Sequence, residues 1–340
     1  MSRSAPEAAA RVGSATELGG ELSRQLSRVM PHDGYLLTGY DPITGERCFL
    51  ACENDYDVRA RRRMDFENAL GRTRSPVAEL IHGSCPALVL GAGAHDEHPQ
   101  ARRLHRLMAA ESYGSELCIA LTQRGVAWGA LVLLRERGSR PFSPAEAARA
   151  AELAQPLAQA VKRYVTSKPL RPKIASFPPI VAVIDGDDQI AGATSAGFDA
   201  LRAVLPGVYP TRPAGDKETF GFVWHIAYTA RRTAAPALTR APTAAGWLSL
   251  QAQPLEGAAP GAVVVTLQPA QAADLLPALA QWYGISVRER TVIEQALEGQ
   301  AVKQIARRLA LSPHTVNDHF KAIYRKTSVT SREELIACLA

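Results

Sequence analysis

The sequence lacks the features that define several large classes of protein. No apolar run approaches the length of a membrane span, and the N-terminus has no apolar core of the kind found in signal peptides. Cysteines are few, scattered and odd in number, which favours reduced thiols in a cytoplasm over a disulfide framework. They are Cys48, Cys52, Cys85, Cys118 and Cys338.

Motifs of common enzyme classes are also missing. The chain has no Walker lysine motif and no Gly-x-Ser-x-Gly elbow. Gly91-Ala92-Gly93 lacks the third glycine and the acidic partner of a dinucleotide site, and His95-Asp96-Glu97-His98 groups possible metal ligands in a polar loop without helical spacing. Asp185-Gly186-Asp187-Asp188 resembles the acidic pocket of a receiver domain, but the later aspartate and lysine of that family are absent. We therefore predict no enzyme, no cofactor and no metal site.

The chain does have the size and composition of a globular protein with several domains. Its 340 residues are too many for one ordinary core, and 46% are apolar while 21% are charged. Aromatic residues make up only 6%. The net charge of +6 permits a polyanionic partner without requiring one.

The first unit is predicted to be α+β. A helix over about residues 15–30 precedes two strands, at 35–40 and 47–52, which flank a turn. A polar, arginine-rich region around Arg61 and Arg63, expected to form a solvated face, leads to a helix near Pro76–His82. Two further strands, at 116–121 and 127–134, precede a helix that opens at Ser143-Pro144 with Glu146 completing a capping box.

These strands and the closing helix resemble the end of a GAF domain, a module that senses small molecules or signals. The resemblance is good over residues 115–164 and implies a small-molecule effector, whose identity the sequence does not give. Four aromatic or cysteine side chains in this unit either line a ligand pocket or pack in the core, and core packing is the favoured interpretation. They are Tyr35, Tyr40, Cys118 and Trp128.

A linker and a second α+β unit are predicted to follow. Residues 166–179 contain four prolines and several basic residues, which suits a linker. Strands are expected at 180–185, near 189–190, at 247–252 and at 262–267, with a short helix at 197–204; the order resembles a small PAS-like fold. Residues 206–245 give no clear pattern.

The last part of the chain has the densest signals. A helix is expected at 272–283, and capping boxes begin helices at Ser286–Glu289 and Ser331–Glu334. Between them lie a short helix at 301–309 and a longer one that Ser312 and Pro313 start, with Val316, Phe320 and Ile323 as its buried stripe. Short helices with a tight turn satisfy the geometry of a helix-turn-helix.

The motifs here resemble the LuxR/GerE-type DNA-binding domain. They include Ser286–Arg290, Gln304–Leu309, Leu311–Val316 and Ser331–Leu335. In that family the equivalents of Asn317, Asp318 and Lys321 face the bases. The equivalents of Lys303, His314, Thr315 and Arg325 lie near phosphates. The sequence departs from the family at two places. His314 replaces a basic residue common in the family. Thr327-Ser328 replace leucine and glycine, so the residue at which the recognition helix ends is not predicted.

We therefore predict a cytoplasmic transcription regulator that binds double-stranded DNA. Residues 282–340 hold nine basic and six acidic side chains, a surplus of three, so a homodimer on two half-sites is expected rather than a monomer. RNA polymerase is a further possible partner, and no membrane is involved. The alternative is a ligand-binding sensor whose C-terminal head contacts another protein. The predicted architecture is an α+β GAF-like domain (1–165), a linker (166–179), an α+β PAS-like domain (180–270) and an all-α four-helix helix-turn-helix domain (271–340).

Overall fold

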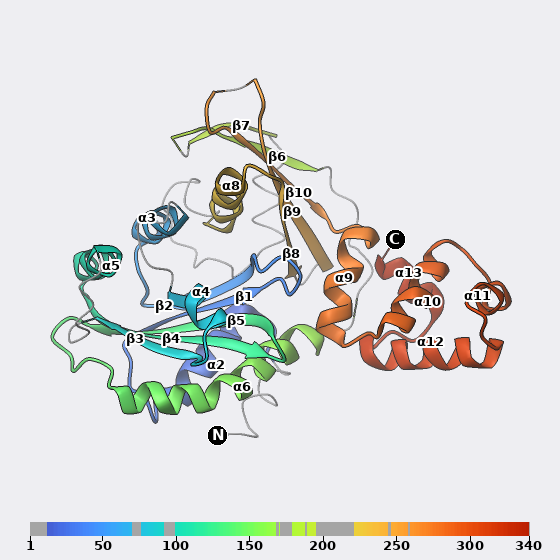
Figure 1. The fold of residues 1–340 in the computed structure, drawn as a ribbon, viewed down its shortest axis with the longest axis horizontal. Helices are drawn as coiled ribbons and strands as arrows, with labels where there is room; N and C mark the ends of the chain where they lie inside the picture. The colour runs from blue at the N-terminus through green and yellow to red at the C-terminus, as the bar shows by residue number, and fades with distance from the viewer. Residues whose placement is uncertain are drawn as a thin grey trace.

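The chain forms two five-stranded antiparallel sheets and a C-terminal group of short helices (Figure 1). No helix among the described residues is long and apolar enough to cross a membrane. The computed structural model describes residues 12–69, 76–91, 99–167, 170, 179–187, 189–194, 221–243, 246–257 and 259–339.

The first sheet has the strand order β2-β1-β5-β4-β3. Its strands are β1 (Gly34–Tyr40), β2 (Arg47–Glu53), β3 (Ala87–Gly91), β4 (Tyr113–Gln123) and β5 (Val126–Glu136). The central pair, β4 and β5, is longer at both ends than the sequence predicts. Arg124 and Gly125 join them with φ of 54° and 76°, the left-handed conformation that a two-residue hairpin turn uses to match strand twist.

Helices cover both faces of this sheet. α2 (Ala15–Leu26) and α6 (Pro144–Thr166) pack on one face, and α3 (Val58–Ala69), α4 (Pro76–His82) and α5 (Pro99–Ala110) on the other (Figure 1). The capping box predicted for α6 is confirmed, because Ser143 and Glu146 exchange both hydrogen bonds. α3 and α5 were not predicted. On α3 the solvated-face prediction is wrong for Arg61, whose side chain is 12% exposed and pairs with Asp55.

The second sheet repeats the strand order of the first. Counted along the chain, both sheets run second, first, fifth, fourth, third. The strands here are β6 (Ile180–Ile184), β7 (Ile190–Ala193), β8 (Ala237–Thr243), β9 (Gly246–Pro254) and β10 (Val263–Pro269). α8 (Gly221–Thr233) packs on one face. α8 and β8 lie in the region 206–245, for which no element was predicted, and the helix predicted at 197–204 lies outside the described residues.

The two sheets meet through side chains at their edges. Thr239 of β8 donates its hydroxyl hydrogen bond to the carbonyl of Arg47 in β2, at 2.9 Å. Arg240 of the same strand pairs with Asp41, in the turn after β1, at 2.7 Å with both side chains at most 5% exposed. α8 adds His225, whose Nε2 lies 3.1 Å from Glu46. β2 and β8 are both end strands, so each sheet covers one edge of the other.

One helix, α9 (Ala272–Tyr283), joins the sheets to the C-terminal helices. Near its start the carbonyl of Asp274 accepts a hydrogen bond from Arg240, the residue that also pairs with Asp41. At its end Gly284 adopts φ of 66° and caps the helix in the left-handed conformation that glycine favours.

The four helices after α9 form a small cluster that we call the head. They are α10 (Val287–Leu297), α11 (Val302–Arg308), α12 (Pro313–Thr327) and α13 (Arg332–Leu339). The capping box at Ser286 and Glu289 is confirmed. At the one predicted for Ser331, the Ser331 hydroxyl accepts from the amide of Glu334, and the Glu334 carboxylate accepts from the amide and hydroxyl of Thr330. The hydrogen bonds from Thr330 lower the pKa of the Glu334 carboxyl.

Candidate nucleic-acid interface

The longest helix of the head, α12, begins where the sequence predicts. The Ser312 hydroxyl accepts from the amide of Thr315 at 3.0 Å, and Pro313 occupies the first helical position. Val316, Phe320 and Ile323 are at most 4% exposed and pack into the core of the head, so the predicted buried stripe is confirmed. This inward packing fixes which side chains face outward.

The outward face of α12 collects polar side chains at helical spacing. His314, Asp318, Lys321 and Arg325 follow one another at steps of three or four residues, Asn317 lies beside Asp318, and all five are exposed. Five of the seven residues predicted to contact DNA thus lie on one face of one helix. The sixth, Thr315, is half-buried, and its hydroxyl oxygen lies 2.9 Å from that of Ser312.

Asp318 stands at the centre of this face and contacts two of its neighbours. Lys321 donates to Oδ1 of Asp318 at 3.1 Å, and Nε2 of His314 lies 3.5 Å from Oδ2. The hydrogen bond from Lys321 and the nearby positive charges lower the pKa of the Asp318 carboxyl. The carboxylate therefore remains charged at neutral pH, beside the positive charge of Lys321.

Three cations on the two helices α11 and α12 have no ion-pair partner among the described residues. They are Lys303 and Arg307 of α11 and Arg325 of α12. Each is exposed, and Lys303 and Arg307 lie one helical turn apart on the same side of α11. Arg307 was not among the residues predicted to contact phosphate. The i,i+4 spacing from Lys303 was the signal that could have identified it.

The far end of α12 is tied to the start of the head. Lys326 donates to the carbonyl of Gly284 at 2.8 Å and pairs with Glu289 at 2.6 Å. Burial would raise the pKa of Glu289, but the hydrogen bonds from Lys326 and Ser286 outweigh it and lower that pKa. The helix ends at Thr327, and Ser328 adopts φ of 57°. A serine thus occupies a left-handed position where glycine has no steric cost.

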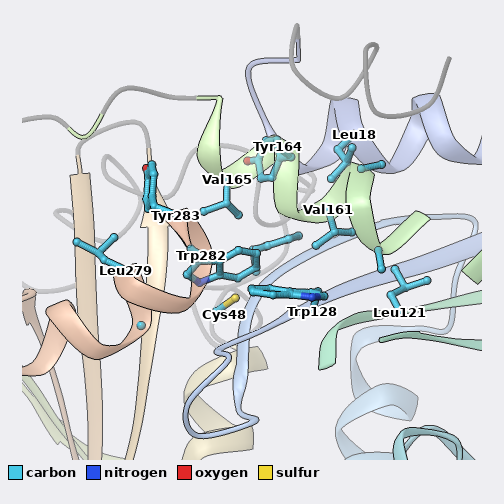
Figure 2. Close-up of a cluster of buried hydrophobic side chains, with 14 of the residues drawn as sticks. Leu18, Cys48, Leu121, Trp128, Val161, Tyr164, Val165, Leu279, Trp282 and Tyr283 are labelled. Carbon is cyan, nitrogen blue, oxygen red and sulfur yellow. The ribbon is translucent and has the colours of Figure 1, made fainter. Parts of the chain in front are cut away.

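Behind the head, α9 is buried against the first sheet. Trp282 is fully buried and its ring centroid lies 4.7 Å from that of Trp128 in β5. Figure 2 shows the two indoles among side chains of α6 and β2, with Cys48 beside them. Leu170 adds a second link, since its amide donates to the carbonyl of Thr327 and its carbonyl accepts from the thiol of Cys338. The head is therefore joined to the rest of the protein through α9 and Leu170.

The side chains considered for a ligand pocket do not line one cavity. Tyr35 and Trp128 belong to the core that includes α2 and α6, whereas Cys118 belongs to the separate core under α4 and α5, and all three are at most 3% exposed. Tyr40 is partly buried, and burial raises its pKa to about 12. Core packing, the favoured interpretation, holds for the three buried members.

A buried carboxyl lies beside Cys118. Glu116 is 5% exposed, and its carboxyl oxygens accept hydrogen bonds from the hydroxyl of Tyr56 and the thiol of Cys118. No ion pair with a cation is formed by Glu116 in the described part of the chain. Burial raises its pKa to about 7, while the bond from Tyr56 opposes that shift. This carboxyl changes charge within the physiological pH range.

A surface pocket of about 420 Å³ lies between the ends of β1 and β5 and the start of α6. Arg135 lines it, but all three of its guanidinium nitrogens donate to protein acceptors: the carbonyls of Pro31 and Arg140 and the carboxylate of Glu146. These bonds hold the wall of the pocket together and explain its geometry without a ligand. No group of three possible metal ligands occurs in the described ranges, and His95–His98 lies outside them.

Comparison with known proteins separates the head from the sheets. The family model of bacterial regulatory proteins, luxR family, matches residues 284–339. The C-terminal head is a luxR-type helix-turn-helix. The match covers α10 to α13 and none of the ten strands of the two sheets. In this head α11 and α12 are the two helices of the helix-turn-helix, and α12 is the second of them.

Solved structures align with the chain only weakly. The crystal structure of Escherichia coli SdiA is 15% identical and covers 100% of this chain and 94% of that one, with a TM-score of 0.38. A GAF domain from a Coxiella burnetii phosphoenolpyruvate-protein phosphotransferase is 20% identical over 47% of this chain and 89% of its own, with a TM-score of 0.31. The GAF domain of the cyanobacteriochrome TePixJ is 11% identical over 46% and 94%, with a TM-score of 0.32. These scores are too low to decide fold or function. No curated protein matches the chain.

Proposed function

We propose that this protein is a sequence-specific DNA-binding transcription regulator, with sensing units in front and a DNA-reading head at the C-terminal end. The observation that supports it is the luxR-type head, whose α12 presents an amide, an acid and bases on one exposed face. Amide and charged side chains at these positions suit hydrogen bonds to base edges in the major groove. The free cations beside them suit contacts with phosphate.

The proposed roles follow the position of each side chain. Asn317, Asp318 and Lys321 lie in the middle of the outward face of α12 and are assigned to the bases. The phosphate contacts are assigned to the side chains around that central group. They are Lys303, His314, Thr315 and Arg325, with Arg307 added because it is exposed, forms no ion pair within the described ranges and lies one turn from Lys303.

The two sheets are proposed to be a GAF-like sensor (1–165) and a PAS-like unit (180–270), separated by a linker (166–179) and followed by the head domain (271–340). Their shared strand order supports two modules of related architecture. A small molecule bound by the first module would act on the head through α9, because α9 contacts both sheets and leads directly into α10. Arg240 at its start and Trp282 at its end are the contacts that would transmit the change.

A homodimer is the proposed DNA-binding unit. The head carries a charge surplus of only three between residues 282 and 340, so one copy neutralises few phosphates. Two heads on the half-sites of a palindrome would double that number and add specificity.

The test is a gel-shift of genomic fragments across a salt series. DNA binding predicts that the logarithm of affinity falls linearly with the logarithm of salt concentration, with a slope near −0.9 per phosphate contact. Asn317→Ala and Lys321→Ala should each weaken sequence preference while the protein stays folded, since both side chains are exposed. A head that binds no DNA at low salt but captures a protein partner would favour the alternative, a sensor whose head contacts another protein.

A further inference from the structure

Two charged side chains on the outward face of α12 form a pair whose purpose is not stability. Lys321 Nζ lies 3.1 Å from Asp318 Oδ1, and the two side chains are 72% and 52% exposed. An exposed pair at this spacing stabilises a helix only slightly. A carboxylate in the middle of a surface that meets DNA also repels phosphate. The pair therefore weakens a general attraction to DNA and stabilises the fold very little.

The pair does match one feature of DNA closely. In the major groove a G·C pair presents two acceptors, N7 and O6 of guanine, followed by the N4 amino donor of cytosine. A lysine ammonium has three donors, so after one is given to Asp318 two remain for N7 and O6. The Asp318 carboxylate has acceptor sites left for the N4 amino group.

The spacing agrees as well. Guanine O6 and cytosine N4 are themselves joined by a hydrogen bond, so they lie about 2.9 Å apart. The Lys321 nitrogen and the Asp318 oxygen are separated by 3.1 Å, which places a donor opposite the acceptor and an acceptor opposite the donor. We propose that Lys321 and Asp318 read one G·C base pair as a single unit, an inference that rests on the proposed DNA-binding function.

The other base pairs fit this unit less well: a T·A pair places one acceptor, O4 of thymine, beside the N6 amino donor of adenine, so one donor of Lys321 is left without an acceptor. An A·T pair places the N6 amino donor of adenine where Lys321 needs an acceptor, and a C·G pair reverses the order of donor and acceptors. Asn317, one residue before Asp318, has the amide that suits adenine N6 and N7. The unit would therefore discriminate at one position of the half-site, and Asn317 at another.

The experiment starts by selecting bound sites from a random DNA library with the full chain. Affinities are then measured for the selected site and for the three replacements at each base pair, using the wild type, Asp318→Ala, Lys321→Ala and the double variant. We expect both single variants to lose about 10- to 100-fold discrimination at the same G·C pair and nowhere else. The double variant should lose no more than either single variant, because the unit is already broken. Asp318→Ala should also bind unrelated DNA more tightly, since a repelling charge is gone.

A matched control is the exposed Arg290–Glu294 pair of α10, with a 2.9 Å contact and 43% and 41% exposed side chains. Glu294→Ala should leave every base preference unchanged. The inference is wrong if the two single variants lose discrimination at different base pairs, or if Asp318→Ala leaves all preferences intact. A wild-type chain that binds no DNA would instead refute the proposed function, so the two failures are distinguishable.

Discussion

The outward face of α12 and the surroundings of α9 are opposite kinds of surface. The first is exposed, polar and held by few contacts, and the second is a buried layer where Trp128 and Trp282 meet. Burial gives α9 a large share in stability, whereas exposure leaves α12 free to contact DNA without affecting the fold. Substitutions in the two regions should therefore have separable effects on stability and on DNA affinity.

Replacing Trp282 should have the largest effect on stability. Trp282→Ala removes a fully buried indole and leaves a cavity beside Trp128, so we expect a loss of about 3–5 kcal/mol in the free energy of unfolding. Denaturant unfolding measures this loss. Trp282→Phe, which retains an aromatic ring, is the control and should lose less. A loss below about 0.5 kcal/mol would show that α9 is not anchored there.

Arg240 tests the same layer at the other end of α9. Arg240→Met leaves Asp41 buried without its cation, and we expect the free energy of unfolding to fall by about 3 kcal/mol. The loss should not be larger, because the other carboxylate oxygen of Asp41 still accepts from the amide of Ile43. The double variant Asp41→Asn, Arg240→Met should recover part of that loss, since no buried charge remains. Additive losses in thermal or denaturant unfolding would contradict the pairing.

Glu116 adds a pH dependence to the buried region. Its pKa is raised from 4.5 to about 7, so the unfolded chain ionises first and stability from this group is lost as the pH rises between those values. At about 1.4 kcal/mol per pH unit, Glu116→Gln should stabilise the protein by about 1–3 kcal/mol at pH 8 and by little near pH 4.5. Unfolding at both pH values measures this. Glu152→Gln, at an exposed position of α6, should change neither.

Lys303 and Arg325 test the exposed surface in the opposite sense. Lys303→Ala or Arg325→Ala should weaken binding to all DNA sequences and reduce the magnitude of the salt slope by about 1 each, because one phosphate contact is lost. Stability should change by less than about 0.5 kcal/mol. Arg308→Ala is a control, because Arg308 pairs with Glu298 on the protein. A change in base preference would instead assign Lys303 or Arg325 to the bases.

Ser328 should give the smallest effect. It holds φ of 57° at the end of α12, so Ser328→Gly relieves steric strain while increasing the freedom of the unfolded chain. We expect the free energy of unfolding, measured by thermal unfolding, to rise by about 0.5 kcal/mol. Ser328→Ala keeps the strained position occupied and should give no gain.

The head was the part most accessible from sequence, because its signals are local. The Ser286–Glu289 box, the Ser312-Pro313 start and the stripe of Val316, Phe320 and Ile323 each lie within one or two helical turns. The outward face followed from the same spacing. What the sequence could not give is the contact between Lys326 and Gly284, which joins residues 42 positions apart.

The two sheets were only partly predictable. Strands in hairpins, such as β4 and β5, have a local turn signal at Arg124-Gly125, but α3 and α8 have none. α3 is rich in arginine, and its partners, such as Asp55 for Arg61 and Asp65 for Arg47, appear only after folding. The pair of Arg240 and Asp41 spans 199 positions, so no pattern of spacing could indicate it.

The meeting of β2 and β8 has a consequence for solubility. An end strand with free amides and carbonyls can recruit strands from other molecules and begin aggregation. Here the hydroxyl of Thr239 in the end strand β8 donates to the carbonyl of Arg47 in the end strand β2, so each sheet shields the other from such recruitment. A substitution that separates the sheets, such as Arg240→Met, would expose both end strands, β2 and β8, at once. Such a variant should aggregate as well as lose stability.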